Sequence, residues 1–192
     1  MIAAFTRGHG DTVRVDLRAA EAQLLADLFH DLLELLTEEA RPHGAGGGGD
    51  PLAAQLGLDR LGDDTPPARP DDPALARLFP DAYPDDPDAT AEFRRYTQPD
   101  LSNERRRRAG VAVDSLDRVK EGGRLTLSAA ESTAWLGALN DLRLVLGTRL
   151  EIIADDQEPG EGFGPDDPRS AYVPVYYYLG YLQETLIEAL AG

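Results

Sequence analysis

The most regular feature of the sequence is a run of leucines near its beginning. Across residues 18–38, apolar side chains recur every three or four positions, and acidic residues fall mainly between them. This spacing places the apolar side chains on one face of an α-helix. The pattern therefore predicts an amphipathic helix over residues 18–38, with an apolar face made of Leu24, Leu25, Leu28, Phe29, Leu32, Leu35 and Leu36.

Two shorter segments before this helix alternate apolar and polar residues, which is the pattern of β-strands. They cover residues 2–6 and 12–16, and the turn between them contains Gly8 and Gly10. A two-stranded hairpin is only marginally stable in water, so this pair must rest on other elements. Residues 124–127 alternate in the same way and predict a third antiparallel strand.

An Asp-Asp-Pro triplet occurs three times, at residues 71–73, 85–87 and 166–168. Aspartate before proline is typical of a helix start, because the carboxylate accepts hydrogen bonds from free amides and proline tolerates the first helical position. Paired carboxylates also occur in acid–base and calcium sites, but the spacing of a calcium-binding EF-hand loop is absent. The triplets therefore predict helix N-termini.

Further helix starts and stops divide the rest of the chain. The middle predicts short helices over residues 73–79 and 87–97, then another that Pro99 opens and that reaches about residue 120. Ser128 and Glu131 then form the capping box of a longer helix. Its inward side chains are predicted to be Trp135, Leu136, Leu139, Leu142, Leu146 and Leu150.

The last helix contains Pro174, which leaves two interpretations open. The helix either begins near this residue or bends there, because an interior proline removes a backbone hydrogen bond. Its apolar stripe consists of Val175, Leu179, Leu182, Leu186 and Leu190.

Two segments have the composition of loops. Residues 41–70 are rich in Gly and Pro, and residues 155–167 are acidic without a basic residue. A segment of this composition buries too little apolar surface to offset the conformational entropy that it would lose on folding. We therefore expect one domain over residues 1–192, with a flexible insertion at 41–70 and a solvated loop at 155–167. The predicted fold class is α+β and mainly α, a helical bundle with a small antiparallel β-sheet.

The composition of the chain excludes several classes of function. Acidic residues outnumber basic ones by 35 to 19, and the formal net charge of −16 repels nucleic-acid phosphates. Cysteine is absent, which removes disulfides, thiolate metal sites and thiol nucleophiles. No apolar run reaches the roughly 20 residues of a membrane helix, and residues 1–7 lack the layout of a signal peptide. We therefore expect a cytoplasmic protein.

Candidate chemistry is scarce. His9, His30 and His43 are not paired as ligands, and no Gly-x-Ser-x-Gly elbow, His-Glu-x-x-His or dinucleotide fingerprint occurs. The glycine run at residues 44–49 lacks the lysine of a phosphate-binding loop. The sequence predicts a protein that is not an enzyme and uses no cofactor or metal. A site assembled from scattered Asp, Glu, Tyr and Arg is the alternative.

Residues 91–120 depart from the acidic character of the chain, with eight basic residues against five acidic ones. Four consecutive arginines, at 105–108, spread over about 300° of a helix, so at least one must lie on apolar surface or pair with a carboxylate. Three interpretations follow. The segment is a counter-charge for the acidic remainder, a docking patch for an acidic partner, or a contact for nucleic acid.

Tyrosines crowd the last helix in greater number than one buried stripe can hold. They either line the edge of the core or form a protein contact surface, because tyrosine offers amphipathic area at small entropic cost. The residues are Tyr172, Tyr176, Tyr177, Tyr178 and Tyr181.

Four blocks of sequence carry a family resemblance: DPALARLFPDAY at 72–83, EFRRYT at 92–97, LNDLRLVLGTRL at 139–150 and YLGYLQETL at 178–186. They resemble an actinobacterial domain-of-unknown-function family that is encoded beside the ClpS protease adaptor and includes AosR-like oxidative-stress regulators. The resemblance implies a transcription regulator that acts through RNA polymerase and its sigma factor. The cysteine pair attributed to redox sensing in such regulators is absent, so a disulfide switch is not implied.

We therefore expect a non-enzymatic, transcription-associated stress regulator that contacts RNA polymerase or a sigma factor. One alternative is an adaptor or modulator of Clp proteolysis, and another is direct DNA binding through the run of arginines. Homo-oligomerisation is left open. The predicted partner-binding residues are Arg94, Arg95, Tyr96, Arg105, Arg106, Arg107, Arg108, Asn140, Asp141, Arg143, Tyr177 and Tyr181.

Overall fold

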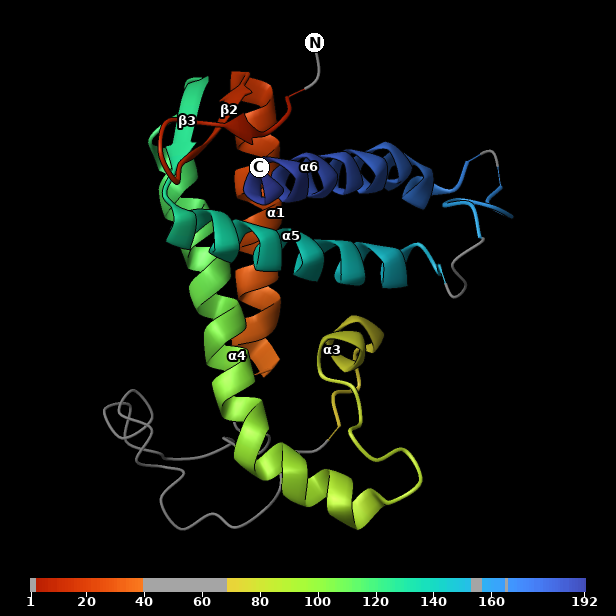
Figure 1. Cartoon of the computed structure of the whole chain (residues 1–192). Helices are drawn as coiled ribbons and strands as arrows, with labels where there is room; N and C mark the ends of the chain where they lie inside the picture. The colour runs from red at the N-terminus through yellow and green to blue at the C-terminus, as the bar shows by residue number, and fades with distance from the viewer. Residues whose placement is uncertain (1–2, 40–68, 153–156, 165) are drawn as a thin grey trace, which may run out of the picture.

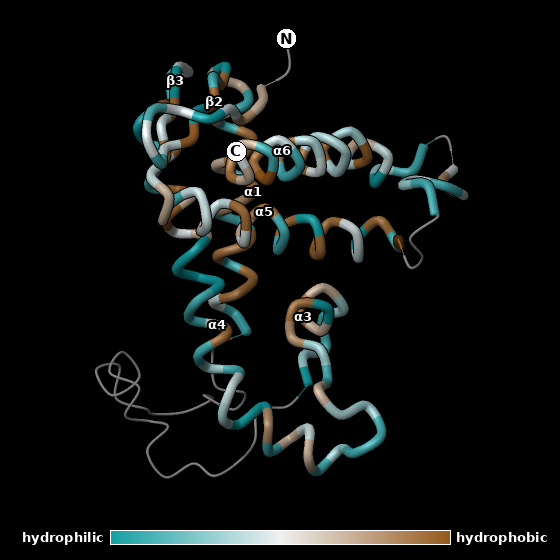
Figure 2. Tube along the Cα trace, viewed as in Figure 1, coloured by the Kyte–Doolittle hydropathy of each residue, from teal (hydrophilic) through white to brown (hydrophobic). Residues whose placement is uncertain are grey.

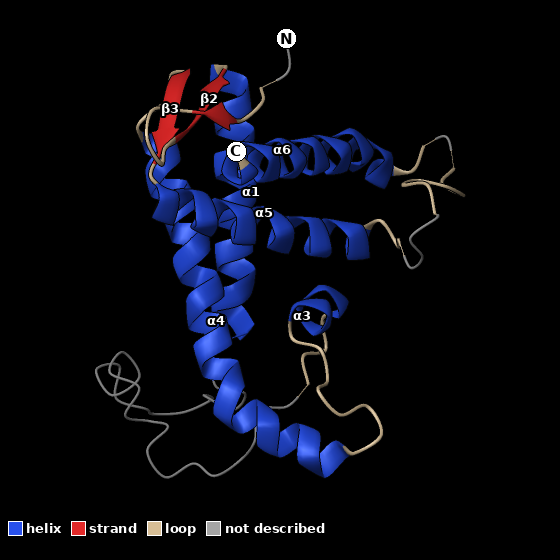
Figure 3. Ribbon diagram, in the orientation of Figure 1, coloured by secondary structure: helices blue, strands red, loops and turns tan. Residues whose placement is uncertain are grey.

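The computed structural model describes residues 3–39, 69–152, 157–164 and 166–192. A small antiparallel sheet lies at one end of a set of packed helices (Figure 1, Figure 3), which confirms the predicted α+β, mainly α, fold class.

Most of the predicted insertion at 41–70 lies outside the described residues, as do residues 155–156 and 165 of the predicted acidic loop. The described part of that loop contains turns and no helix or strand, its residues are exposed or half-buried, and it lies between α5 (Ala129–Arg149) and the start of the last helix (Figure 1).

The helices form two pairs that cross each other. α1 and α4 run side by side, and α5 and α6 lie across them, while the short α3 packs against α5 (Figure 1). α6 begins one residue before Pro174, so this proline lies at the helix start and does not bend the helix. The helical elements are α1 (Ala19–Glu39), α3 (Pro73–Leu78), α4 (Pro87–Asp117), α5 (Ala129–Arg149), the 3-10 helix η2 (Pro168–Tyr172) and α6 (Val173–Ala191).

The sheet contains β1 (Thr6–Arg7), β2 (Val13–Leu17) and β3 (Gly123–Leu127), in that order and antiparallel throughout. The third strand therefore joins the hairpin as predicted. β1 is much shorter than the predicted strand over residues 2–6. The reason is that the amide of Phe5 donates to the Thr185 hydroxyl of α6, at 3.2 Å, instead of to a neighbouring strand.

The Asp-Asp-Pro triplets start helices, as predicted. Asp72, Asp86 and Asp167 each accept hydrogen bonds from amides of the following turn, at 2.7 to 3.2 Å. Ser128 and Glu131 also form the predicted capping box at the start of α5. These contacts satisfy amides that have no partner within a helix.

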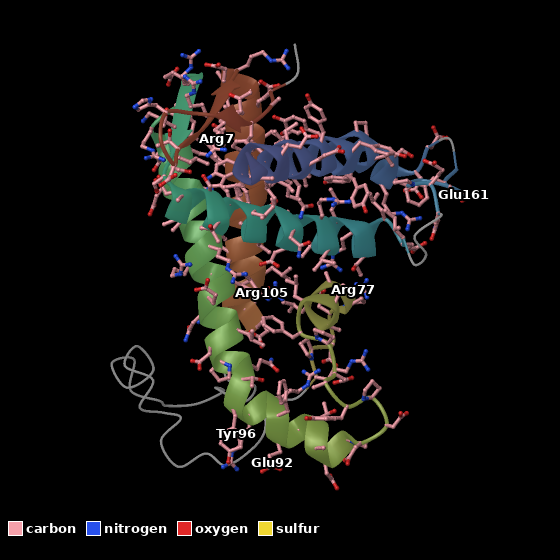
Figure 4. All side chains as sticks on the ribbon, in the orientation of Figure 1. Arg7, Arg77, Glu92, Tyr96, Arg105 and Glu161 are labelled. Carbon is pink, nitrogen blue, oxygen red and sulfur yellow. The ribbon has the colours of Figure 1, made fainter. Side chains whose placement is uncertain are left out.

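The sequence predicts two helices divided at Pro99, and this prediction is wrong. The structure contains one helix, α4, with Pro99 inside it. An interior proline bends a helix, and α4 changes direction near Tyr96 (Figure 4). Contacts beside the bend hold the helix together, because Glu39 of α1 accepts hydrogen bonds from Gln98 at 2.5 Å and from Ser102 at 3.1 Å.

The hydrophobic core centres on Trp135 of α5, which is fully buried. Phe5 and Phe29 contact it edge to face, with ring centroids at 5.6 and 5.4 Å. Its indole N–H donates to the Ser115 hydroxyl of α4 at 2.7 Å. The core therefore joins the N-terminal segment and α1 to α4 and α5 through one side chain.

The inward faces of α5 and α6 largely follow the prediction. Leu136 and Leu146 are only partly buried, and they pack against the core. In α6, Leu179, Leu182 and Leu186 of the stripe are buried and Val175 is partly buried, but Leu190 is exposed and Ala189 is buried at the end of the helix. Figure 2 shows the hydrophobic turns of α5 beside the mainly hydrophilic α4.

Replacing Ser115 by Ala removes the acceptor of the Trp135 indole N–H. The buried donor is then unsatisfied, so we expect the free energy of unfolding to fall by about 1–3 kcal/mol in urea denaturation. Thr133→Ala is the control, because its hydroxyl is exposed and bonds only to the Ala129 carbonyl. Its effect is expected to stay within about 0.5 kcal/mol. Equal losses in both variants would contradict this account of the core.

Candidate protein-interaction surface

The residues predicted to bind a partner do not form one surface. One group lies near the bend of α4, a second lies along the middle of α4 against α5, and a third lies between α5 and α6. Each group has a different environment, and the third borders a groove.

The first group contains a buried member and two surface members. Arg94 is buried, where it donates to an Asp81 carboxylate oxygen at 2.6 Å and to the Phe79 carbonyl at 3.1 Å. It therefore holds the segment after α3 against α4 and is not available to a partner, which corrects its predicted role. Tyr96 is exposed, and the Arg95 guanidinium lies 5.0 Å from the centre of its ring.

The second group contains an ion pair between the half-buried Arg105 of α4 and the buried Asp141 of α5. Arg105 also donates to the Leu78 carbonyl at the end of α3, at 2.9 Å, and lies over the Phe79 ring. In Figure 4, Arg105 points from α4 towards α3 and α5. Burial raises the pKa of Asp141, and the positive charge of Arg105 opposes this shift. Asp141 is therefore structural, which corrects its predicted place in a partner-binding surface.

The other arginines of the run contact side chains of the same helix. Glu104 accepts hydrogen bonds from Arg107 at 2.7 Å and from Arg108 at 2.8 Å, and these contacts lower its pKa to about 2. Arg106 donates to the Asn103 side chain at 2.5 Å. Among the three interpretations of this basic segment, the geometry favours an internal counter-charge, because three of the four consecutive guanidinium groups, those of Arg105, Arg107 and Arg108, already pair with carboxylates of the chain.

The third group borders an open groove of about 730 Å³ between α5 and α6. Three predicted residues, Arg143, Tyr177 and Tyr181, line it, whereas Asn140 is exposed on α5 outside it. The lining residues are Arg143, Tyr176, Tyr177, Gly180, Tyr181, Gln183, Glu184, Ile187 and Glu188.

Arg143 of α5 is held in place by two side chains of α6. It donates to the Gln183 amide oxygen at 2.6 Å, and its guanidinium lies 5.3 Å from the centre of the Tyr176 ring. No carboxylate in the described part of the chain forms an ion pair with it. These contacts join α5 to α6 and give the groove a fixed base.

The rim of the groove is apolar and exposed. Tyr177, Tyr181 and Ile187 expose 51%, 42% and 50% of their surface. The Tyr177 hydroxyl donates to Glu158 at 2.6 Å, which holds the ring at the surface. Exposed aromatic and aliphatic side chains that lie together are typical of protein contact surfaces. The structure therefore favours the contact-surface interpretation for these tyrosines.

The predicted partner-binding residues do not include Ile187, Glu184 or Glu188, which also belong to this surface. Positions 177, 181, 184 and 188 recur every three or four residues and so share one face of α6. This face lies away from the leucine stripe, and the same periodicity that found the stripe could have identified it.

The described residues include no group of three or more His, Cys, Asp or Glu side chains placed to hold a metal ion. Within the same residues, each helix is too short or too polar to cross a membrane.

Comparison with known proteins identifies the family of this chain. The family model described as a domain of unknown function, DUF2017, matches residues 1–190. The chain belongs to the DUF2017 family. The comparison with solved structures finds no match.

Relatives of this DUF2017 protein carry a functional name. It is 37% identical over 137 residues to the oxidative stress regulator AosR of Mycobacterium tuberculosis (strain ATCC 25618 / H37Rv), and the same values hold for AosR of Mycobacterium bovis. The match covers 65% of this chain and 61% of each relative. The chain thus spans about three-fifths of the length of the curated relatives that it matches.

Replacing Arg105 by Met in this DUF2017 protein removes the cation that faces Asp141. A buried carboxylate without its partner destabilises a protein by about 3–5 kcal/mol. We therefore expect the free energy of unfolding, measured by urea denaturation at neutral pH, to fall by about that amount. The loss should shrink as the pH falls. With the folded-state pKa of Asp141 above its unfolded value, the variant gains stability as Asp141 takes up a proton in the folded protein.

Arg106→Met is the matched control for this prediction, because it removes an equal charge from the next position, where the guanidinium bonds to Asn103 at the surface. Its effect should stay within about 0.5 kcal/mol. Similar losses at positions 105 and 106 would show that the pair of Arg105 with Asp141 has no special role.

Proposed function

We propose that this protein is a non-enzymatic stress regulator that works by contacting RNA polymerase or a sigma factor. The names of its relatives support a regulatory role, since they are oxidative stress regulators. The observation that carries the proposal of protein contact is the exposed rim formed by Tyr177, Tyr181 and Ile187 beside Arg143.

This rim has the composition of a binding surface. Tyrosine contributes a large contact area and loses little side-chain entropy on binding, and residues of this type often dominate binding energy. The rim surrounds an open groove rather than a closed cavity, so a partner can reach it without a change in fold. A protein partner suits this surface better than a small molecule, which is usually enclosed on most sides.

The DNA-binding alternative has less support from the side-chain contacts. Arg105 faces Asp141, while Arg107 and Arg108 share Glu104. A phosphate backbone would have to compete with these carboxylates, and the net charge of −16 adds repulsion at long range.

The stress signal would have to reach this chain without sulfur chemistry of its own. Cysteine is absent and Met1 is the single methionine in the sequence. Reversible oxidation in proteins acts mainly on these two residue types. We therefore propose that the partner, or a change in abundance of this protein, conveys the oxidant signal.

The proposal is tested by purifying the tagged full chain from its native host, with and without nuclease. RNA polymerase or a sigma factor should co-purify in both cases. A double substitution, Tyr177→Ala with Tyr181→Ala, should lower the recovery by about tenfold, because it removes two contact residues. Tyr172→Ala is the matched control, since this tyrosine is equally exposed but does not line the groove.

Each alternative gives a different result in this experiment. A complex that disappears with nuclease would indicate binding through DNA, and recovery of Clp components in place of polymerase would indicate the proteolytic role. Recovery of this protein without polymerase or sigma factor, from stressed and unstressed cells, would overturn the proposal.

A further inference from the structure

The exposed face of α6 combines tyrosines with unneutralised acids. α6 contains no basic residue. Glu184 and Glu188 continue the helical line of Tyr177 and Tyr181, and all four are exposed. A stripe of two aromatic and two acidic side chains thus runs along the groove.

No cation of the described chain neutralises this stripe. Glu184 and Glu188 form no ion pair within the described residues. The single basic residue among those that line the groove is Arg143, so the two carboxylates outweigh one guanidinium and the lining has a net charge of −1. The carboxylates therefore present negative charge to whatever occupies the groove.

We propose that the groove binds a basic amphipathic α-helix of the partner protein. This inference rests on the proposed function, in that it names the part of the partner that docks. Lysine or arginine on the docking helix would pair with Glu184 and Glu188 and lie over the rings of Tyr177 and Tyr181. Apolar side chains of the same helix would cover Ile187.

The dimensions of the groove suit a helix. Its lining runs from Tyr176 to Glu188 of α6, and at about 1.5 Å per residue this corresponds to roughly 18 Å, or a little over three helical turns. Ridges of side chains on one helix pack into grooves of another. An extended strand would find no edge to pair with, because the backbone of α6 is hydrogen-bonded within the helix.

The sign of the partner's charge follows from the same residues. An acidic segment would meet Glu184 and Glu188 with like charge, which disfavours binding. A neutral apolar segment would leave both carboxylates without partners at the edge of the interface. A basic segment gains attraction from both, and this attraction should weaken with added salt because the pairs are exposed.

The experiment uses the full chain and two labelled model peptides of 18 residues with identical apolar faces. One carries lysine on its polar face and the other carries glutamate. Fluorescence anisotropy should detect binding of the lysine peptide and little or no binding of the glutamate peptide. Glu184→Lys with Glu188→Lys should weaken binding of the lysine peptide at least about tenfold.

The matched control is Glu34→Lys with Glu38→Lys on α1. These exposed glutamates have the same four-residue spacing, and the double substitution changes the net charge equally. It should leave lysine-peptide binding within about twofold of the unsubstituted chain, because the two residues lie outside the groove. Equal weakening by the two double variants would show general attraction to an acidic protein and would overturn the proposed site.

A substitution that leaves charge unchanged provides a second test. Ile187→Ala should also weaken binding of the lysine peptide, whereas Leu190→Ala should not, since Leu190 is exposed but does not line the groove. If circular dichroism shows that the variant with Glu184→Lys and Glu188→Lys is unfolded, the comparison of Ile187→Ala with Leu190→Ala tests the proposal in its place. No difference between the two variants would count against the groove.

A photo-cross-linking amino acid at position 181, introduced in the native host, separates this inference from the proposed function. Cross-links to a basic helical segment of polymerase or a sigma factor would support both. Cross-links to such a segment of another protein would support the groove and overturn the polymerase proposal. Cross-links to acidic segments or to a second copy of this chain would overturn the docking inference. Co-purification of polymerase without cross-links at position 181 would also overturn the docking inference.

Discussion

The ion pair between Arg105 and the buried Asp141 constrains how the helices pack. A carboxylate removed from water is costly unless a cation faces it, so α4 and α5 must meet with these two residues in contact. Arg105 reaches the last carbonyl of α3 as well, which brings a third helix to the same point. Trp135, about one and two-thirds turns earlier on α5, adds the contacts to the N-terminal segment, α1 and α4.

Asp141 and Trp135 fix the rotation of α5 about its own axis. This rotation determines which side chains α5 directs towards α6. Arg143 is two positions after Asp141, and two helical steps turn a side chain by about 200°. It therefore points away from α4 and reaches α6, where Gln183 and Tyr176 engage it. The base of the groove is thus a consequence of the same packing that buries Asp141.

The arrangement also separates the two charged surfaces that the composition suggests. The arginines on α4 are largely satisfied within the chain, whereas the glutamates on α6 are not. The surface suited to a partner is consequently acidic and aromatic. A chain with a large negative net charge can thereby select a basic partner segment, and its own basic residues stabilise the fold.

The sequence by itself determined the features that depend on neighbours three or four residues apart. These include the helix starts at the Asp-Asp-Pro triplets, the leucine stripes and the burial of Trp135. It also identified Arg143, Tyr177 and Tyr181 as surface candidates, although it could not show that they share one groove.

Only the tertiary structure decided that Arg105 pairs with the buried Asp141, that Arg94 is buried against Asp81, and that α4 continues through Pro99. The physical reason is that these outcomes depend on contacts between distant residues. Arg105 and Asp141 are 36 positions apart, and Gln98 meets Glu39 across 59 positions. Helical periodicity describes which residues share a face of one helix, but the partner of that face is chosen by packing between helices.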